Sequence, residues 1–178
     1  DIELIGATAI EDKLQKGVPD AIESFLRAKI HVWIITGDKR ETAINIGYAC
    51  SLLSSEMIIK TFDKETLDEN LESAENEEGE LALVITGSAI PELLSETYVN
   101  RFVELSKRCR SVICCRVSPL QKALIVKTMR EKTSAMAVSI GDGANDVGMI
   151  LEADVGIGVS GKEGRQAVLA SDYSIAQF

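Results

Sequence analysis

Two aspartates and an asparagine are concentrated at residues 141–146, a Gly-Asp-Gly-Ala-Asn-Asp run that follows an apolar stretch. The two glycines allow a sharp turn close to a ligand, and the start of a following helix offers N–H groups to an anion. Mg²⁺ takes oxygen ligands, usually one or two carboxylates together with substrate phosphate, and Asp142 and Asp146 fit that requirement. Taken alone, the run also fits an acidic helix start in which Asn145 caps the helix and Asp146 complements its dipole.

A second polar turn, Thr36-Gly37-Asp38, follows the apolar, β-branched stretch at residues 30–35 and precedes a helical pattern. Turns after parallel strands gather at the carboxyl edge of an α/β sheet, where ligands bind. The Thr36 hydroxyl and the Gly37 N–H are donors suited to phosphate oxygens. An ordinary helix-capping turn has the same composition and is the alternative.

A third element runs from Arg116 to Lys122, after a predicted strand at residues 111–115 and with Pro119 in the first turn of a predicted helix. Lys122 has the wrong charge sign for the start of a helix dipole, so an anion at the sheet edge explains it better than capping does. A solvated surface lysine is the alternative. The expected apolar face of this helix consists of Leu120, Ala123, Leu124, Val126, the stem of Lys127 and Met129.

In this order, the three motifs resemble the haloacid dehalogenase superfamily, and within it the phosphorylation domain of P-type ATPases. The resemblance rests on Thr36-Gly37-Asp38, on Lys122 and on the Gly-Asp-Gly-X-Asn-Asp loop at residues 141–146. The flanking residues 6–15 and 171–178 are similar to type IV P-type ATPases, the lipid flippases. The resemblance covers nearly the whole chain and leaves only its acidic middle poorly matched.

The resemblance implies a role for each motif in phosphoryl transfer from ATP. Thr36 and Gly37 would hold phosphoryl oxygens, and Lys122 would neutralise developing charge. Asp38 and Arg116 would flank the nucleotide. In-line phosphoryl transfer needs this kind of charge neutralisation and positioning more than acid–base chemistry.

The resemblance also implies how the acidic loop would work. Asp142 would bind Mg²⁺ directly, with Asp146 beside it as a second metal ligand, and Asn145 would orient the phosphoryl group. Asn145 and Asp146 would both contact the nucleotide. Mg²⁺ and ATP are therefore the expected cofactors.

One feature of the family is missing from the sequence. Its catalytic aspartate lies in an Asp-Lys-Thr-Gly-Thr motif, and no such string occurs among the 178 residues. The nearest string, at residues 63–66, lacks the glycine and a preceding apolar strand, so we reject it as the nucleophile. In P-type ATPases the motif lies upstream, beyond the nucleotide-binding domain. Residues 1–178 are therefore expected to form a single domain, the second segment of a phosphorylation domain that lacks its first strand.

The expected function is a share in ATP hydrolysis through an aspartyl-phosphate, coupled in a larger protein to phospholipid movement. The resemblance implies nucleotide-binding, actuator and transmembrane domains as partners, and a location on the cytosolic face of a membrane. The isolated chain is expected to be inactive because covalent catalysis cannot begin without the nucleophile. The alternatives are a soluble haloacid dehalogenase-type phosphatase that acts on small phosphate esters, and a non-enzymatic binding module.

Composition limits the other classes. A hydrophobic content of 46% over 178 residues supplies one core. No run of about 18 apolar residues is present, so no membrane span is expected. The net charge of −9 argues against nucleic acid as a partner. The four cysteines lack zinc spacing and are expected to be buried, reduced thiols.

Strand and helix patterns alternate along the chain, which predicts an α/β fold with a doubly wound, Rossmann-like parallel sheet of the haloacid dehalogenase type. The acidic stretch at residues 61–80 is expected to include a flexible insertion, most acidic at 68–80. Strands are predicted at residues 3–7, 31–36, 57–60, 81–86, 111–115, 135–140 and 155–158, and helices at residues 18–28, 41–52, 64–74, 92–107, 119–131, 146–152 and 163–170.

Overall fold

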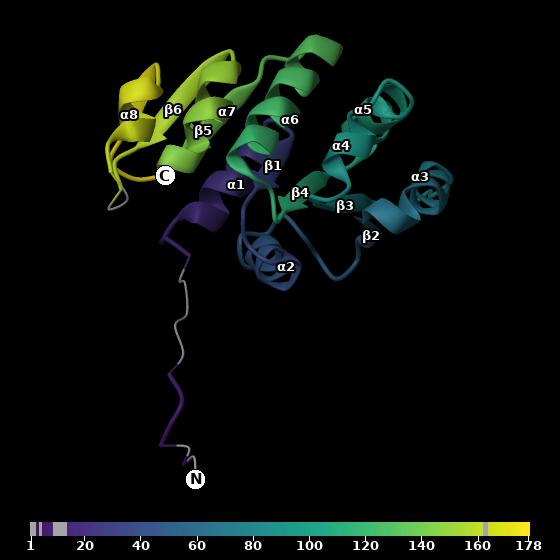
Figure 1. Cartoon of the computed structure of the whole chain (residues 1–178), viewed down its shortest axis with the longest axis horizontal. Coiled ribbons are helices and arrows are strands. Elements are labelled where there is room, and N and C mark those ends of the chain that lie inside the picture. The colour runs from purple at the N-terminus through teal and green to yellow at the C-terminus, as the bar shows by residue number, and fades with distance from the viewer. Residues whose placement is uncertain (1–2, 4, 9–13, 162–163) are drawn as a thin grey trace.

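The structure, a computed structural model, describes residues 3, 5–8, 14–161 and 164–178. Helices and strands alternate along it (Figure 1). The helical elements are α1 (Val18–Arg27), α2 (Arg40–Ala49), η1 (Lys64–Thr66), α3 (Leu67–Glu75), α4 (Ile90–Leu93), α5 (Val99–Arg108), α6 (Pro119–Lys132), η2 (Ala144–Asp146), α7 (Val147–Glu152) and α8 (Gln166–Ala170). The strands are β1 (Val32–Ile35), β2 (Ile58–Phe62), β3 (Leu81–Thr86), β4 (Ser111–Cys115), β5 (Val138–Gly141), β6 (Val155–Val159) and β7 (Tyr173–Ile175).

The described strands form two parallel sheets. One has four strands in the order β1–β4–β3–β2, and the other has three in the order β5–β6–β7. All strand pairs in both sheets are parallel, so the predicted α/β class with parallel strands is confirmed. The expected single sheet is divided, because β1 and β5 each have a hydrogen-bonded neighbour on one side only.

The four-stranded sheet is covered by helices on both faces. On β3, Leu81, Leu83 and Ile85 point into a core that includes side chains of α3 and α5. The alternate residues Ala82 and Val84 pack on the opposite face, where α2 lies. A strand buried on both sides needs a continuous apolar run rather than an alternating one, and β3 has that composition.

Helix α6 connects the two sheets. Its residue Ile125 lies in the core of the four-stranded sheet. On its other side it packs on α7, where a Cβ at Gly148 would lie 3.2 Å from the Cβ of Ala123. Figure 1 shows α6 beside α7 on one side and near α5 and β4 on the other. The connection between the sheets is therefore made by helix packing rather than by strand pairing.

The predicted apolar face of α6 is correct only in part. Val126 is buried and Met129 packs against the core, as predicted. Leu120 is 80% exposed and Leu124 is 42% exposed, whereas Lys122 and Ile125, which were not predicted to face the core, are buried. The helix turns Lys122 inward because its ammonium group has a buried carboxylate partner there. Apolar periodicity could not predict this orientation, since a lysine is assigned to the exposed face of a helix unless its buried partner is known.

The acidic stretch at residues 61–80 contributes to the core of the sheet. It contains the end of β2, the turn η1 and the helix α3, which connects β2 to β3. Leu67, Leu71 and Ala74 are buried in the main core cluster. Their spacing of four and then three residues gives α3 an apolar stripe despite its many carboxylates. The expectation of a flexible insertion is therefore wrong for α3, which is a crossover helix of the sheet.

Two further expectations differ from the structure, and one strand was not expected. Residues 3 and 5–7 do not form the predicted strand, and residue 4 lies outside the described residues. The helix predicted at 92–107 is divided into α4 and α5 by a turn in which Tyr98 and Val99 donate backbone N–H bonds to the Ser95 carbonyl. Strand β7 was not predicted, because three residues are too few for a strand pattern; all three are exposed.

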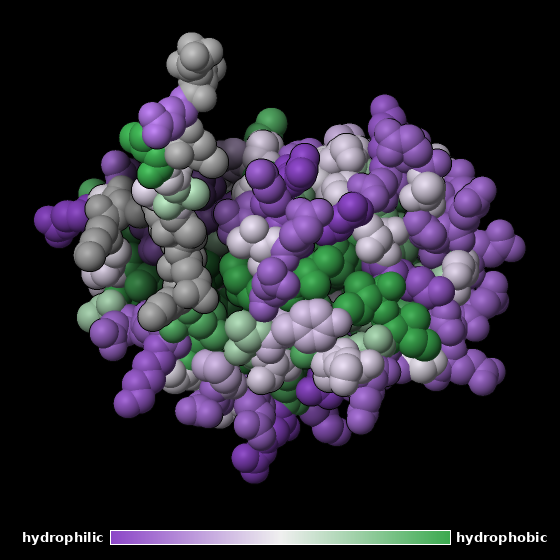
Figure 2. Space-filling model, turned by 90° about the horizontal axis from the view of Figure 1, so that it is seen from below, coloured by the Kyte–Doolittle hydropathy of each residue, from purple (hydrophilic) through white to green (hydrophobic). Residues whose placement is uncertain are grey.

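No helix in the described part of the chain is both long and apolar enough to cross a bilayer. Apolar side chains are nevertheless open to solvent, among them Leu120, Leu151 and Leu169. On the face seen from below, Figure 2 shows patches of apolar surface among hydrophilic side chains.

Candidate functional site

The turn after β1 is closed by its own side chains. The Thr36 hydroxyl donates to Asp38 Oδ2 at 2.9 Å, and the Asp38 N–H donates to Thr36 Oγ1 at 3.1 Å. Gly37 and Asp38 are exposed, and Thr36 is half-buried. This local pattern is that of an ordinary polar turn, and it leaves the Gly37 N–H at the carboxyl end of the strand open to a ligand.

The turn after β4 is hydrogen-bonded to the turn after β1. The Arg116 N–H donates to the Asp38 carbonyl at 2.8 Å, and the Val117 N–H donates to the Thr36 carbonyl at 3.1 Å. Arg116 has a φ of 53°, a left-handed conformation that is uncommon for a residue with a side chain. The strained residue is held by the bonds on either side of it, and its side chain is exposed at the same edge as Asp38.

Lys122 forms a buried ion pair with Asp146. The Nζ–Oδ1 distance is 2.7 Å, and the two side chains are 6% and 8% exposed. The interpretation of Lys122 as a solvated surface lysine is therefore wrong. The pair links the first turn of α6 to the loop that follows β5.

Asp146 also shapes that loop. Its Oδ2 atom accepts the backbone N–H groups of Asp142 and Gly143, both at 3.3 Å. A Cβ at Gly141 would lie 2.4 Å from the Asp146 Cβ, so the loop can close around this carboxylate only with glycine at 141. Both oxygens of Asp146 are thus occupied by protein donors.

Asp142 has the opposite environment. Its side chain is exposed, and within the described ranges its carboxylate makes no hydrogen bond or ion pair. Gly161, just after β6, lies beside it, and a Cβ there would make an ordinary van der Waals contact with Asp142 Oδ2 at 3.5 Å. Asn145 is exposed on the same loop. Among the residues that the structure describes, the Asp142 carboxylate is therefore unpaired, and it lies at the carboxyl ends of β5 and β6.

The donor set fits only part of a magnesium site. In the described segments, no group of three or more His, Cys, Asp or Glu side chains lies close enough together to hold a metal ion. Mg²⁺ is commonly held by one or two carboxylates with water and substrate phosphate supplying the rest. Asp142 can supply one such oxygen, whereas Asp146 would have to give up Lys122 or the loop N–H groups.

A cavity of about 990 Å³ lies between the two sheets, and we refer to it as the slot. Its walls include β1, residues 138–141 of β5, and apolar side chains of α1 and α6. Asp142 lies among its lining residues, directly after β5. Because β1 and β5 are both edge strands, the slot has a free strand edge on each side. Buried backbone N–H and C=O groups need hydrogen-bond partners, so an added strand fits the slot chemically.

Three residues that organise this site were not predicted from the sequence. Ser118 and Gln121 form a reciprocal capping box at the start of α6. The Gln121 side chain also donates to the Gly87 carbonyl at 2.7 Å, which joins α6 to the loop after β3. The Ser-x-x-Gln spacing before an apolar run is a sequence pattern typical of a capping box and could have identified the first two.

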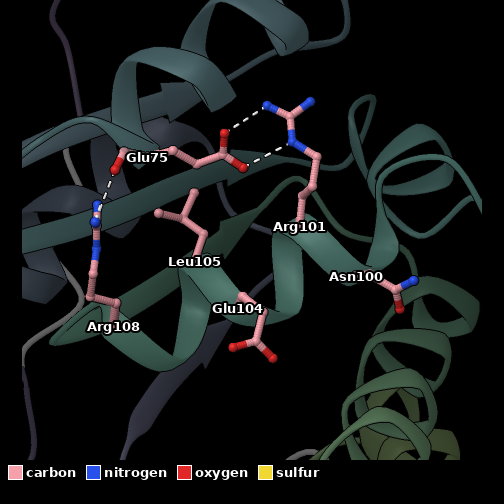
Figure 3. A pocket seen from close by; sticks show the side chains of 6 residues that line it. All are labelled: Glu75, Asn100, Arg101, Glu104, Leu105 and Arg108. Carbon is pink, nitrogen blue, oxygen red and sulfur yellow. Dashed lines mark hydrogen bonds and ion pairs between the residues drawn. The ribbon is translucent and has the colours of Figure 1, made fainter.

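A second, smaller pocket lies between α3 and α5 (Figure 3). Arg101 donates two hydrogen bonds to the Glu75 carboxylate, at 2.9 and 2.7 Å, and Arg108 donates to the Glu75 carbonyl at 2.9 Å. Figure 3 shows both arginines directed at Glu75 rather than into open space. These contacts attach the C-terminal end of α3 to α5, so this pocket has a structural explanation.

The four cysteines are free and buried, as expected. Burial raises the pKa of the Cys109 thiol to about 12 from the ordinary 9.0. Burial also raises the pKa of Cys50, Cys114 and Cys115 above the ordinary 9.0. At neutral pH these thiols are protonated, which leaves them without a nucleophilic role.

Comparison with known proteins gives related sequences but no matching family model. "Phospholipid-transporting ATPase 6" of Arabidopsis thaliana is 48% identical over 200 residues, and a phospholipid-transporting ATPase of Schizosaccharomyces pombe is 49% identical over 191 residues; both alignments cover 100% of the chain. "Phospholipid-transporting ATPase VD" of Macaca fascicularis is 47% identical over 188 residues, with 99% of the chain covered. The chain spans only 16%, 15% and 28% of the length of these relatives, respectively.

Proposed function

The chain belongs, as a segment, to the phospholipid-transporting type IV P-type ATPases, and from that premise we propose that it is the second segment of their phosphorylation domain. In the whole protein it takes part in the transfer of the ATP γ-phosphoryl group to an aspartate and in the hydrolysis of that aspartyl-phosphate. The reaction drives phospholipid movement. The segment lies on the cytosolic face and works with nucleotide-binding, actuator and transmembrane domains.

One observation carries the proposal. The Thr36–Asp38 turn and the Arg116 turn, at the carboxyl ends of β1 and β4, are hydrogen-bonded to each other. Lys122, in the first turn of α6, is joined through Asp146 to the Asp142 loop at the carboxyl end of β5. Ligands of open α/β sheets bind at that edge. The exposed groups at this edge include the Gly37 N–H, the Arg116 guanidinium and the Asp142 carboxylate. That mixture suits a phosphate–Mg²⁺ complex.

The slot supports the proposal that this segment lacks one strand of the sheet. A strand of four or five residues, parallel to β1 and β5, can pair with both free edges and join the two sheets into one. The residue that follows such a strand would lie at the carboxyl edge, between the turn after β1 and the loop after β5. An aspartate at that place is the nucleophile of the proposed reaction.

The residues of the segment then have separate tasks. Thr36 and Gly37 bind phosphoryl oxygens, and Asp38, Arg116 and Asn145 contact the nucleotide from the exposed edge. Asp142 holds Mg²⁺, which when bound neutralises charge on the phosphate oxygens. Lys122 neutralises charge from the side of α6, and Asp146 keeps both Lys122 and the Asp142 loop in place.

Labelling with [γ-³²P]ATP tests the proposal. The full-length polypeptide is expected to form an acid-stable phosphoprotein, and Asp142→Asn in that polypeptide is expected to abolish it. The 178-residue chain alone is expected to take up no label, because it has no nucleophile after a strand in the slot. Labelling of the isolated chain, or full labelling of the Asp142→Asn polypeptide, would overturn the assignment.

A further inference from the structure

Gln121 uses both ends of its side-chain amide. Its Oε1 atom accepts the Ser118 N–H at 3.0 Å, and its Nε2 atom donates to the Gly87 carbonyl at 2.7 Å. In return, the Gln121 N–H donates to Ser118 Oγ at 3.3 Å. Only this orientation of the amide places an acceptor toward the N–H and a donor toward the carbonyl. A capping box needs the contact between Gln121 Oε1 and the Ser118 N–H, but it does not need the bond from Gln121 Nε2 to the Gly87 carbonyl. The bond to Gly87 therefore has a structural role other than capping.

The loop that contains Gly87 is itself held closely against the turn after β4. The Gly87 N–H donates to the Cys115 carbonyl at 2.9 Å. A Cβ at Gly87 would lie 2.1 Å from the Arg116 carbonyl oxygen, a distance that no side chain allows. Arg116 in turn is bonded to Asp38. Through Gly87, Gln121 therefore attaches the start of α6 to a rigid set of turns at the edge of the four-stranded sheet.

The residue after Gln121 makes the contact with the other sheet. Lys122 leaves the same turn of α6 and reaches Asp146, whose second oxygen holds the N–H groups of Asp142 and Gly143. Two adjacent side chains of α6 thus join the polar turns of the two sheets, one through Gly87 and one through Asp146. Since β1 and β5 do not pair, the position of this helical turn contributes to how the two halves of the site face each other.

We propose that Gln121 is a positioning residue, which holds the first turn of α6 against the loop after β3 so that Lys122 reaches Asp146 and fixes the Asp142 loop. The contribution of Lys122 to phosphoryl chemistry rests on the proposed function. The contacts of Gln121 and Lys122 do not.

The experiment compares variants of the 178-residue chain by NMR. Gln121→Glu keeps an acceptor for the Ser118 N–H but has no hydrogen for the Gly87 carbonyl. Gln121→Met removes both contacts without adding a charge, which controls for the new carboxylate. Ser118→Ala removes the hydroxyl half of the cap and leaves the bond to Gly87 intact. The signals of the Lys122 ammonium and of the Asp142 and Gly143 amides report the ion pair and the loop, and a melting curve reports stability.

Both Gln121 variants are expected to shift the Lys122 signal and to speed exchange of the two loop amides by at least about tenfold. Ser118→Ala is expected to lower the melting temperature and leave those signals in place. The proposal is overturned if the Gln121 variants keep wild-type signals, or if Ser118→Ala disturbs them equally. If Gln121→Glu fails to fold, Gln121→Met decides. No ATP is present in this experiment, so its failure is distinct from failure of the labelling test.

Discussion

Lys122 and Asp146 are 24 residues apart in sequence, and their charged atoms lie 2.7 Å apart in a site that solvent hardly reaches. The pair joins α6 to the loop after β5, and the Asp146 carboxylate also accepts two backbone N–H groups of that loop. A buried charge that loses its partner is strongly destabilising, because its desolvation is no longer compensated. The lysine therefore has a structural task as well as its proposed chemical one.

Lys122→Ala is expected to destabilise the 178-residue chain by about 3–5 kcal/mol, because Asp146 is left buried and unpaired. Chemical denaturation measures this loss. Lys107→Ala is the matched control, since Lys107 pairs with Glu104 on the surface, where its side chain is 46% exposed. Exposed pairs contribute about 1 kcal/mol or less. Equal losses in the two variants would show that the Lys122 pair is solvated.

Asp142→Asn is expected to leave the stability of the chain within about 0.5 kcal/mol of wild type, since the exposed carboxylate makes no contact in the described part of the chain. The same substitution is expected to weaken Mg²⁺ binding, which is already weak because one carboxylate is an incomplete ligand set. A Mg²⁺ titration followed by NMR checks both the affinity and the place. Shifts centred on the carboxylates of α3 would put the cation elsewhere.

Gly87→Ala is expected to destabilise the chain by about 1–3 kcal/mol, the usual effect of a forced backbone shift in a packed region. Its Cβ would lie 2.1 Å from the Arg116 carbonyl oxygen. Gly37→Ala is the control at the end of another strand, where the nearest atom to a new Cβ is 3.7 Å away. Thermal melting of both variants makes the comparison. A Gly87→Ala chain as stable as the Gly37→Ala chain would mean that the two loops can separate freely.

Leu71→Ala tests whether the acidic helix α3 belongs to the core. Leu71 is fully buried, so its truncation is expected to destabilise the chain by about 2–5 kcal/mol. Glu69→Ala, at an exposed position of the same helix, is expected to change stability by no more than about 0.5 kcal/mol. Urea denaturation gives both values. A neutral Leu71→Ala would restore the interpretation of this stretch as an insertion.

The buried thiols are expected to resist alkylation in the native chain at pH 8 and to react after denaturation. Burial holds the pKa of Cys109 at about 12, whereas an unfolded thiol ionises near 9.0. Protonated thiols are poor nucleophiles. Because the folded chain holds the Cys109 proton more tightly than the unfolded chain, this thiol contributes to the free energy of unfolding. Its contribution is complete below about pH 9 and is lost as the pH rises from there toward 12. Rapid native alkylation would contradict this burial.

Several features of the molecule were predictable from the sequence. The alternation of apolar runs with helical patterns predicted the α/β class and parallel strands, because each run in such a sheet is buried on both faces. The polar turns at Thr36 and at Asp142 were identified by glycines and carboxylates directly after those runs. These are local patterns, and they need no knowledge of the neighbouring elements.

Other features depend on contacts between residues far apart in the chain, and only the tertiary structure decided them. The burial of Lys122 depends on Asp146, the attachment of Gln121 depends on Gly87, and the buried side of α3 depends on the sheet beneath it. The division into two sheets belongs to the same class, because it follows from which strand edges are unpaired. A lysine, a glutamine and a row of carboxylates all favour the surface by their own hydration. They are placed inside, or beside the core, only when the fold brings a partner of the right charge, a carbonyl or an apolar face within reach.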